Sequence, residues 1–200
     1  MNIKKRISVL SACAVAALIS VPVAAAAASA DTAAPVPAKV QSTLVNAPSN
    51  VKSWISDISS KPDRKIVSLS QTAYHLKHKA TATSTVAPAG IPTGCGLWVV
   101  IYVEDGRYVT SSSLTSCTYT VQHMEMVGGI ALSAWWGWDE MTRDDTADSL
   151  ENNLAMDFSY DCAGSGTHDW QTVVEGDIQT LSGDEYNADA YDVINSYHCP

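Results

Sequence analysis

The chain has 200 residues, with 21 Asp or Glu against 12 Lys or Arg and a formal net charge of −9 at pH 7. The charge is uneven: residues 31–94 hold seven Lys or Arg against three Asp, net +4, whereas residues 95–200 hold two Arg against 18 Asp or Glu, net −16. An acidic body repels phosphate backbones and anionic lipids, which argues against a nucleic-acid partner and favours cations or a basic protein partner.

The first 30 residues have the features of a secretory signal peptide. Residues 1–6 are basic, residues 7–23 are apolar, and residues 28–30, Ala-Ser-Ala, form a small-x-small cleavage signal. A competing lipoprotein box ending at Cys13 follows too short an apolar stretch. No later apolar run reaches the roughly 18 residues of a membrane span. The sequence therefore predicts that residues 1–30 are removed and that the protein is secreted.

Residues 31–94 are rich in Ala, Pro, Ser and Thr and are interpreted as a basic low-complexity segment, either a linker or a pro-region. One short helix is predicted near residues 50–60, with Ser49 as its N-cap and Pro62 beyond its end. Its apolar stripe contains Val51, Trp54, Ile55 and Ile58. A second helical stripe contains Ile66, Leu69, Ala73 and Leu76. The first helix is too short to persist alone, so we expect it to dock on the rest of the chain.

From residue 95 onward the apolar period becomes two, which is typical of strands. Residues 97–103 (LWVVIYV) fit a buried strand, Asp105-Gly106 fits a hairpin turn, and residues 107–112 fit the returning strand. A third strand is predicted over residues 117–126, ending at the glycines 128 and 129.

Residues 130–139 are predicted as a fourth strand, in which alternate side chains point to opposite faces. This parity places Trp136 and Trp138 in the core and leaves Trp135 on the other face. An exposed tryptophan can stack on a sugar ring or anchor a partner's side chain. The candidate binding residues are Trp135, Ser133 and Asp139. The alternative is that the helix around Trp54 or another loop covers Trp135.

The acidic run over residues 139–151 (DEMTRDDTADSLE) is predicted to be a loop between strands. Calcium takes six to eight oxygen ligands, so clustered carboxylates on an extracellular loop indicate a candidate calcium site. The candidate ligands are Asp144, Asp145, Asp148 and Glu151. The central glycine of an EF-hand loop is missing, and the alternative is a solvated loop with no cofactor.

Three further strands are predicted over residues 154–162, 170–178 and 185–198. The alternation places on one face of the first strand Leu154, Met156, Phe158, Tyr160 and Cys162. In the second strand it places on one face Trp170, Thr172, Val174, Gly176 and Ile178. In the last of them, the inward-facing residues are predicted to be Tyr191, Val193, Tyr197 and Cys199.

Four cysteines lie beyond the signal peptide, and in a secreted chain they imply two disulfides. Folding the first hairpin about Asp105-Gly106 places Cys95 opposite Ser116, so a single bulge would bring Cys95 into register with Cys117. Cys162 and Cys199 each end a strand, which favours their pairing. The predicted bridges are Cys95–Cys117 and Cys162–Cys199.

About seven strands with regular turns predict an all-β fold for residues 95–200, an antiparallel immunoglobulin-like β-sandwich with two disulfides. A flexible, partly helical segment, residues 31–94, precedes it. With its signal peptide, its AWWGWDE and CAGSGTHDW stretches and its terminal cysteine, the chain resembles small secreted β-domain proteins of Gram-positive actinomycetes over residues 95–200. The resemblance implies this fold and no particular chemistry.

Catalytic motifs are absent, and no catalytic residue is assigned. Ser165 and His168 are three residues apart and would suit a hydrolase dyad only if the fold oriented both side chains. The leading hypothesis is a secreted, non-enzymatic binding module for an unidentified extracellular ligand. The alternatives are a secreted toxin or inhibitor-type effector with a basic pro-segment, and a small extracellular hydrolase.

Overall fold

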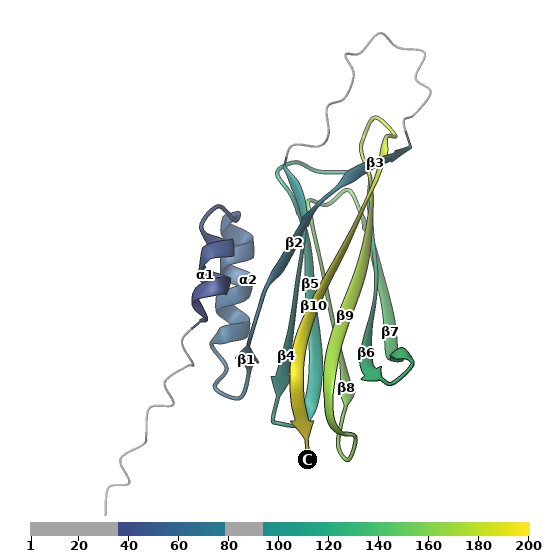
Figure 1. Ribbon diagram of the computed structural model, residues 1–200. Helices are drawn as coiled ribbons and strands as arrows, with labels where there is room; N and C mark the ends of the chain where they lie inside the picture. Colours follow the sequence, from purple (N-terminus) through teal and green to yellow (C-terminus); the bar gives the residue numbers. More distant parts are fainter. Residues whose placement is uncertain (1–35, 79–93) are drawn as a thin grey trace, which may run out of the picture. The chain divides into compact units, whose positions relative to one another are not determined.

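The computed structural model of the protein describes residues 36–78 and 94–200 (Figure 1). The predicted signal peptide and the Ala/Thr-rich stretch at residues 79–93 lie outside the described residues. Within the described part of the chain, no helix is long and apolar enough to cross a membrane.

The strands form two antiparallel sheets of five strands each. Sheet A contains β1 (Lys65–Ile66), β2 (Ser70–Ala73), β4 (Cys95–Glu104), β5 (Tyr108–Cys117) and β8 (Asn153–Asp161). Its order is β1-β4-β5-β8, and β2 also pairs with β4. Sheet B contains β3 (His75–His78), β10 (Glu185–Cys199), β9 (Gly166–Gln179), β6 (His123–Ala134) and β7 (Gly137–Ser149), in that order. The predicted β-rich fold is confirmed, with seven strands, β4 to β10, beyond residue 94.

The main core lies between the two sheets and takes alternate side chains from each strand, as the period of two requires. Strand β8 contributes Leu154, Met156 and Phe158, and strand β9 contributes Trp170 and Val174. These are the faces that the sequence predicts for the two strands.

Strand β4 is buried on both faces because two helices cover the outer side of sheet A. The helices are α1 (Ala38–Leu44) and α2 (Ser49–Ser59). Leu97, Val99 and Ile101 face the main core. Trp98 and Val100 pack in a second cluster with Val51, Ile55 and Ile58 of α2. The fully apolar sequence of β4 therefore serves two cores at once.

The predicted helix near residues 50–60 is confirmed and it docks, but not where the sequence suggested. Trp54 Nε1 donates a hydrogen bond to Ser112 Oγ of β5 at 3.2 Å, so the helix lies on sheet A. Trp135 belongs to sheet B's β6–β7 hairpin and is 91% exposed. The prediction that this helix covers Trp135 is wrong. The helix begins at Ser49 after Pro48, and Ser49 makes no side-chain cap.

The prediction of a second helix is also wrong, because residues 65–78 form three short strands. β1 and β2 pair with β4 in sheet A, and β3 pairs with β10 in sheet B. The chain passes from one sheet to the other at Tyr74, which is buried, with its hydroxyl 2.6 Å from Thr115 Oγ1. Residues 65–78 are part of both sheets rather than a flexible linker, because they pair with the otherwise open edges of β4 and β10.

The structure corrects three predictions around the tryptophans. Strand β6 runs unbroken through Gly128 and Gly129, so the glycine pair is not a turn. A Cβ on Gly128 would lie 2.8 Å from Met156 Cε, so this glycine permits close packing of the two sheets. The chain turns instead at Trp135 and Trp136, and the predicted strand over residues 130–139 is split between β6 and β7. The acidic run is the edge strand β7, not a loop.

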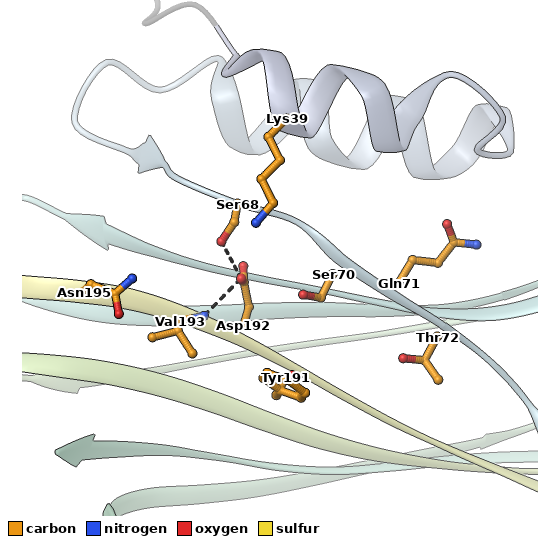
Figure 2. Close-up of a pocket in the computed structure, with 9 residues that line it drawn as sticks. All are labelled: Lys39, Ser68, Ser70, Gln71, Thr72, Tyr191, Asp192, Val193 and Asn195. Atoms are coloured by element: carbon orange, nitrogen blue, oxygen red, sulfur yellow. Dashed lines mark hydrogen bonds between the residues drawn. The ribbon is translucent and has the colours of Figure 1, made fainter.

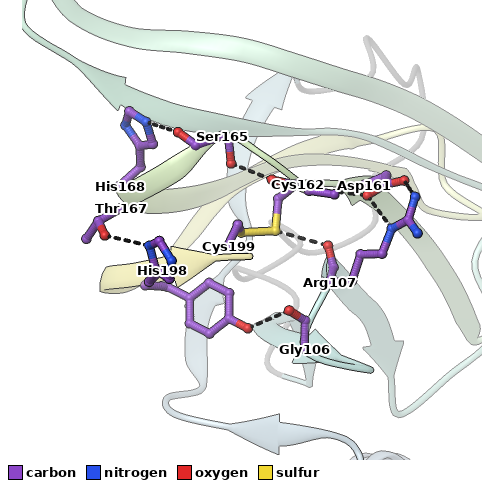
Figure 3. The surroundings of a disulfide bond; sticks show 11 residues. Gly106, Arg107, Asp161, Cys162, Ser165, Thr167, His168, His198 and Cys199 are labelled. Atoms are coloured by element: carbon purple, nitrogen blue, oxygen red, sulfur yellow. Dashed lines mark hydrogen bonds and ion pairs between the residues drawn. A yellow bond between two sulfur atoms is a disulfide. The ribbon is translucent and has the colours of Figure 1, made fainter.

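Both predicted disulfides are confirmed. Cys95 lies directly opposite Cys117 because Glu104 pairs with Tyr108, which leaves three residues in the hairpin loop instead of two. No bulge is therefore needed. Cys162, at the end of β8, joins Cys199 of β10, so the second bridge links sheet A to sheet B (Figure 3).

Strand β10 contains a bulge between Ile194 and Tyr197, where Ser196 has a φ of 52°. The bulge shifts the alternation of side chains, so one parity cannot describe the whole strand. Cys199 is buried and Tyr197 packs against the core, as predicted. Tyr191 is 63% exposed, and Val193 is only partly buried. The prediction that these two residues face inward is therefore wrong.

Candidate binding face on sheet B

The turn between β6 and β7 exposes three tryptophans, which we call the tryptophan hairpin: Trp135, Trp136 and Trp138. Their exposed fractions are 91%, 62% and 46%. The prediction that Trp136 and Trp138 lie in the core is therefore wrong, and the reason is the turn. Gly137, between them, has a φ of 137°, which favours glycine.

Contacts within and below the hairpin fix its geometry. The rings of Trp135 and Trp136 meet edge to face, with centroids 5.0 Å apart. Trp136 Nε1 donates to Asp139 Oδ1 at 2.7 Å. Ser133 Oγ accepts a hydrogen bond from the Asp169 amide at 3.0 Å. Ser133 and Asp139, two of the predicted binding residues, thus hold the hairpin in place.

His168 ties the base of the hairpin to a neighbouring loop. Its Nδ1 lies 2.9 Å from Ser133 O. Its Nε2 lies 2.9 Å from Ser165 O (Figure 3). The Ser165 hydroxyl donates to Cys162 O at 2.6 Å. The imidazole therefore contacts the serine's backbone and not its hydroxyl, and the pair lacks the hydrogen bond between nucleophile and base that a hydrolase needs.

Strand register shows which residues share the outer face of sheet B. Nearest the tryptophan hairpin, Ser133 pairs with Trp138. Two rows follow, which we call the hollow rows. One contains Val193, Gln171, Ala131 and Glu140. The other contains Tyr191, Val173, Gly129 and Arg143.

The hollow rows surround a depression of about 310 Å³ that reaches from Trp138 to Glu175. Its floor is low because Gly129 and Ala131 have little or no side chain there. Trp138 and Val173 give it apolar surface, since both are about half exposed. Glu140 and Arg143, 3.9 Å apart, and Gln171 supply hydrogen-bonding groups at its rim.

Two further rows, which we call the acidic rows, continue the face away from the hairpin. One contains Asp189, Glu175, Val127 and Asp145. The other contains Asn187, Asp177, Glu125 and Ala147. Lys77 of β3 pairs with Asp177 at 2.9 Å. The outer face of sheet B therefore has an aromatic end and an anionic end.

The predicted calcium ligands fall on an extended strand and the turn after it. Register places Asp145 on the outer face, whereas Asp144 and Asp148 belong to the opposite face of β7. Asp144 and Asp148 each accept a hydrogen bond from the amide of the following residue. Across residues 36–78 and 94–200, no group of three or more His, Cys, Asp or Glu side chains is placed to hold a metal ion.

A second cavity, of about 440 Å³, lies between β10 on one side and β2 with the residues just before it on the other (Figure 2). Asp192 is buried at its floor and accepts hydrogen bonds from the Ser68 hydroxyl, the Val193 amide at 3.0 Å and the Ile101 amide at 3.3 Å. Burial raises the pKa of Asp192, against the effect of these donors and of Lys39 nearby. These contacts give the carboxylate a role in the fold, because it joins three segments of the chain.

Of the three predicted binding residues, Trp135 is exposed as the sequence suggested. Trp136, Trp138, Val173 and Tyr191 are not among the predicted binding residues. A straight strand through residues 130–139 places Trp136 and Trp138 in the core, and an unbroken parity over residues 185–198 does the same for Tyr191. Gly137 was the available signal, since a glycine among tryptophans indicates a turn as well as a strand.

Comparison of the chain with protein-family models, with curated proteins and with solved structures finds no significant match.

Proposed function

We propose that this protein is an extracellular, non-enzymatic binding module that recognises a glycan on the outer face of sheet B. The observation that carries the proposal is the tryptophan hairpin: three large aromatic side chains stand exposed beside a depression with polar groups at its rim. Exposed apolar surface of this kind usually marks an interaction site.

A sugar ring suits this surface chemically. Its faces carry C–H groups, which pack on an indole ring, and its edges carry hydroxyl groups, which need hydrogen-bonding partners. Trp138 provides an aromatic surface, while Glu140, Arg143 and Gln171 provide acceptors and donors around it. The hairpin's internal hydrogen bonds also reduce the entropy lost when a ligand binds.

The extracellular location, an immunoglobulin-like β-sandwich topology and kinship with small secreted β-domain proteins of actinomycetes belong to the same proposal. The two disulfides are compatible with export. A toxin or inhibitor with a removable basic segment is less favoured, because residues 65–78 pair with both sheets. A hydrolase is less favoured because the Ser165 hydroxyl points to Cys162 O.

Replacing Trp138 with alanine tests the proposal. Affinity electrophoresis in gels containing neutral, cationic or anionic polysaccharides would first identify the retarding glycan. We expect Trp138→Ala to weaken binding of that glycan about ten-fold, since loss of a stacking aromatic costs about 1.5 kcal/mol. Trp135→Ala should weaken it as well.

The matched control is Leu181→Ala, which removes an exposed apolar side chain from the β9–β10 turn. It should bind like the unmodified protein. If no polysaccharide retards the protein, or if Trp138→Ala and Trp135→Ala leave retardation unchanged with their circular dichroism intact, the proposed function is wrong.

A further inference from the structure

The outer face of sheet B changes character along its length, and register sets the scale of that change. Successive rows are about 6.8 Å apart along a strand. Trp138 and Asp145 on β7 are separated by three such steps, so the aromatic and acidic ends lie roughly 20 Å apart. One sugar unit cannot contact both ends, whereas an extended oligomer can.

The acidic rows hold carboxylates that form no salt bridge among the described residues, although the charge of Lys77 acts on Glu175 as well as on Asp177. Within the described residues, Lys77–Asp177 and Arg143–Glu140 are the salt bridges on this face. Asp145, Glu175 and Asp189 lie in one row across three strands without a salt bridge to any described Lys or Arg. Neighbouring carboxylates repel one another, and a cationic ligand would relieve that repulsion.

We propose that the ligand is a cationic glycan, a polymer of amino sugars with free ammonium groups. This inference rests on the proposed function and adds the charge of the ligand. One part of the polymer stacks on Trp138 and fills the hollow rows, and the adjoining units place their ammonium groups over Glu175 and Asp145. Anionic glycans are repelled by the acidic rows, and neutral glycans gain nothing from them.

A basic polypeptide is the other occupant that the charge would suit. It would contact the acidic rows through Lys or Arg side chains. It would not require the aromatic surface, which the row spacing places roughly 20 Å away. The exposed tryptophans and the hollow at one end therefore favour the glycan. The two occupants differ in whether binding depends on Trp138.

The test compares three hexasaccharides that differ only at C2 of each β-1,4-linked unit, which carries an ammonium, an acetamide or a hydroxyl group. Binding to the full-length, disulfide-bonded protein is measured by calorimetry at about pH 5.5, where a sugar amine is protonated and exposed carboxylates are ionised. We expect the glucosamine hexamer to bind at least about ten-fold more tightly than either neutral hexamer, with a preference that weakens as salt is added.

The double variant Glu175→Gln, Asp145→Asn removes two charges from the acidic rows and keeps the shape of both side chains. It should reduce the preference for the glucosamine hexamer about three- to ten-fold, as expected for two exposed ion pairs. The matched control, Asp57→Asn with Asp63→Asn, removes the same charge from α2 and from the turn after it. It should leave the preference unchanged.

The outcomes separate the two proposals. Equal binding of all three hexamers that is lost in Trp138→Ala would keep the proposed function and overturn the charge inference. A preference for the glucosamine hexamer that the Glu175 and Asp145 substitutions do not change would also overturn the charge inference. Binding of poly-L-lysine as tight as that of the glucosamine hexamer, and unaffected by Trp138→Ala, would assign the face to a basic polypeptide and also overturn it. Failure of every hexamer to bind would overturn the charge inference, whereas the proposed function would be overturned only if no polysaccharide retards the protein in the gels.

Discussion

Asp192 replaces part of a β-ladder with a side chain. β1 pairs with Tyr102 and Val103 of β4, and β2 begins pairing at Val99, so Ile101 has no partner on this edge. A buried amide without an acceptor is costly. The Asp192 carboxylate, arriving from the other sheet, accepts the Ile101 amide instead. This one residue therefore links sheet A to sheet B at the point where the residues between β1 and β2 do not pair with β4.

The raised pKa of Asp192 predicts how this contact depends on pH. Because the folded-state pKa lies above the unfolded value, the folded protein holds more protons in the interval between them, and its free energy of unfolding falls as pH rises through that interval. The variant Asp192→Asn has no titrating group at this position. We therefore expect the free energy of unfolding of the protein, measured relative to that of the variant, to fall as pH rises above about 4. Urea unfolding at several pH values measures it.

Asp161 provides a control of opposite sign. Its hydrogen bonds from the Arg107 guanidinium lower the pKa of Asp161 to about 2. Its contribution is present above the unfolded pKa and is lost as pH falls toward about 2. The free energy of unfolding of Asp161→Asn should therefore differ most from that of the protein at neutral pH. A stability difference for Asp192→Asn that grows with pH in the same way would contradict the assignment.

At the scale of elements, residues 36–78 complete the fold rather than precede it. Helix α2 covers Trp98, Val100, Tyr102 and Leu114 of sheet A. The strands that follow occupy edges of both sheets. Open strand edges and exposed apolar faces promote aggregation. A segment with the composition of a linker thus supplies both a covering layer and edge strands.

We expect residues 94–200 produced alone to be unable to form a stable monomer. Removing residues 36–78 exposes the four apolar side chains under α2 and the edges of β4 and β10, which should cause dye binding to apolar surface, aggregation and a loss of cooperative thermal unfolding. Dye fluorescence, light scattering and calorimetry measure these effects. The control is the same fragment co-expressed with residues 36–78 as a separate chain, which should restore a soluble complex. A soluble, cooperatively unfolding fragment would show that the segment is dispensable.

At the scale of the whole molecule, the two disulfides join different parts of the fold. Cys95–Cys117 joins neighbouring strands within sheet A, and Cys162–Cys199 joins sheet A to sheet B. Around the second bridge, the Tyr197 hydroxyl also donates to Gly106 O at 2.9 Å (Figure 3). The ends of β8 and β10 and the β4–β5 hairpin are therefore held together at one end of the two sheets.

Removing either bridge should lower the free energy of unfolding by about 3–4 kcal/mol, because the bridges close loops of 22 and 37 residues in sequence separation. Cys95→Ala with Cys117→Ala, and Cys162→Ala with Cys199→Ala, are compared by urea unfolding. Single domains are stable by only about 5–15 kcal/mol, so loss of both bridges should leave little or no folded protein. Unfolding midpoints that do not change on reduction would contradict this expectation.

The sequence by itself determined the features that depend on neighbouring residues. The period of two in Leu154, Met156 and Phe158 fixed the inner face of β8, and the apolar run through Leu97 and Val99 fixed a strand buried on both sides. Strand ends next to cysteines also favoured the two disulfide pairings that the structure contains.

Tertiary structure decided what local pattern leaves ambiguous. Ile66, Leu69 and Ala73 have helical spacing, yet Ile66 and Ala73 pair with β4. A helix at this site would leave the backbone amides and carbonyls along this edge of β4 without strand partners. The turn at Trp135 and the bulge before Tyr197 each shift the alternation of side chains. A shift of one residue moves every later side chain to the other face, and for that reason only the folded chain reveals the tryptophan hairpin and the face beside it.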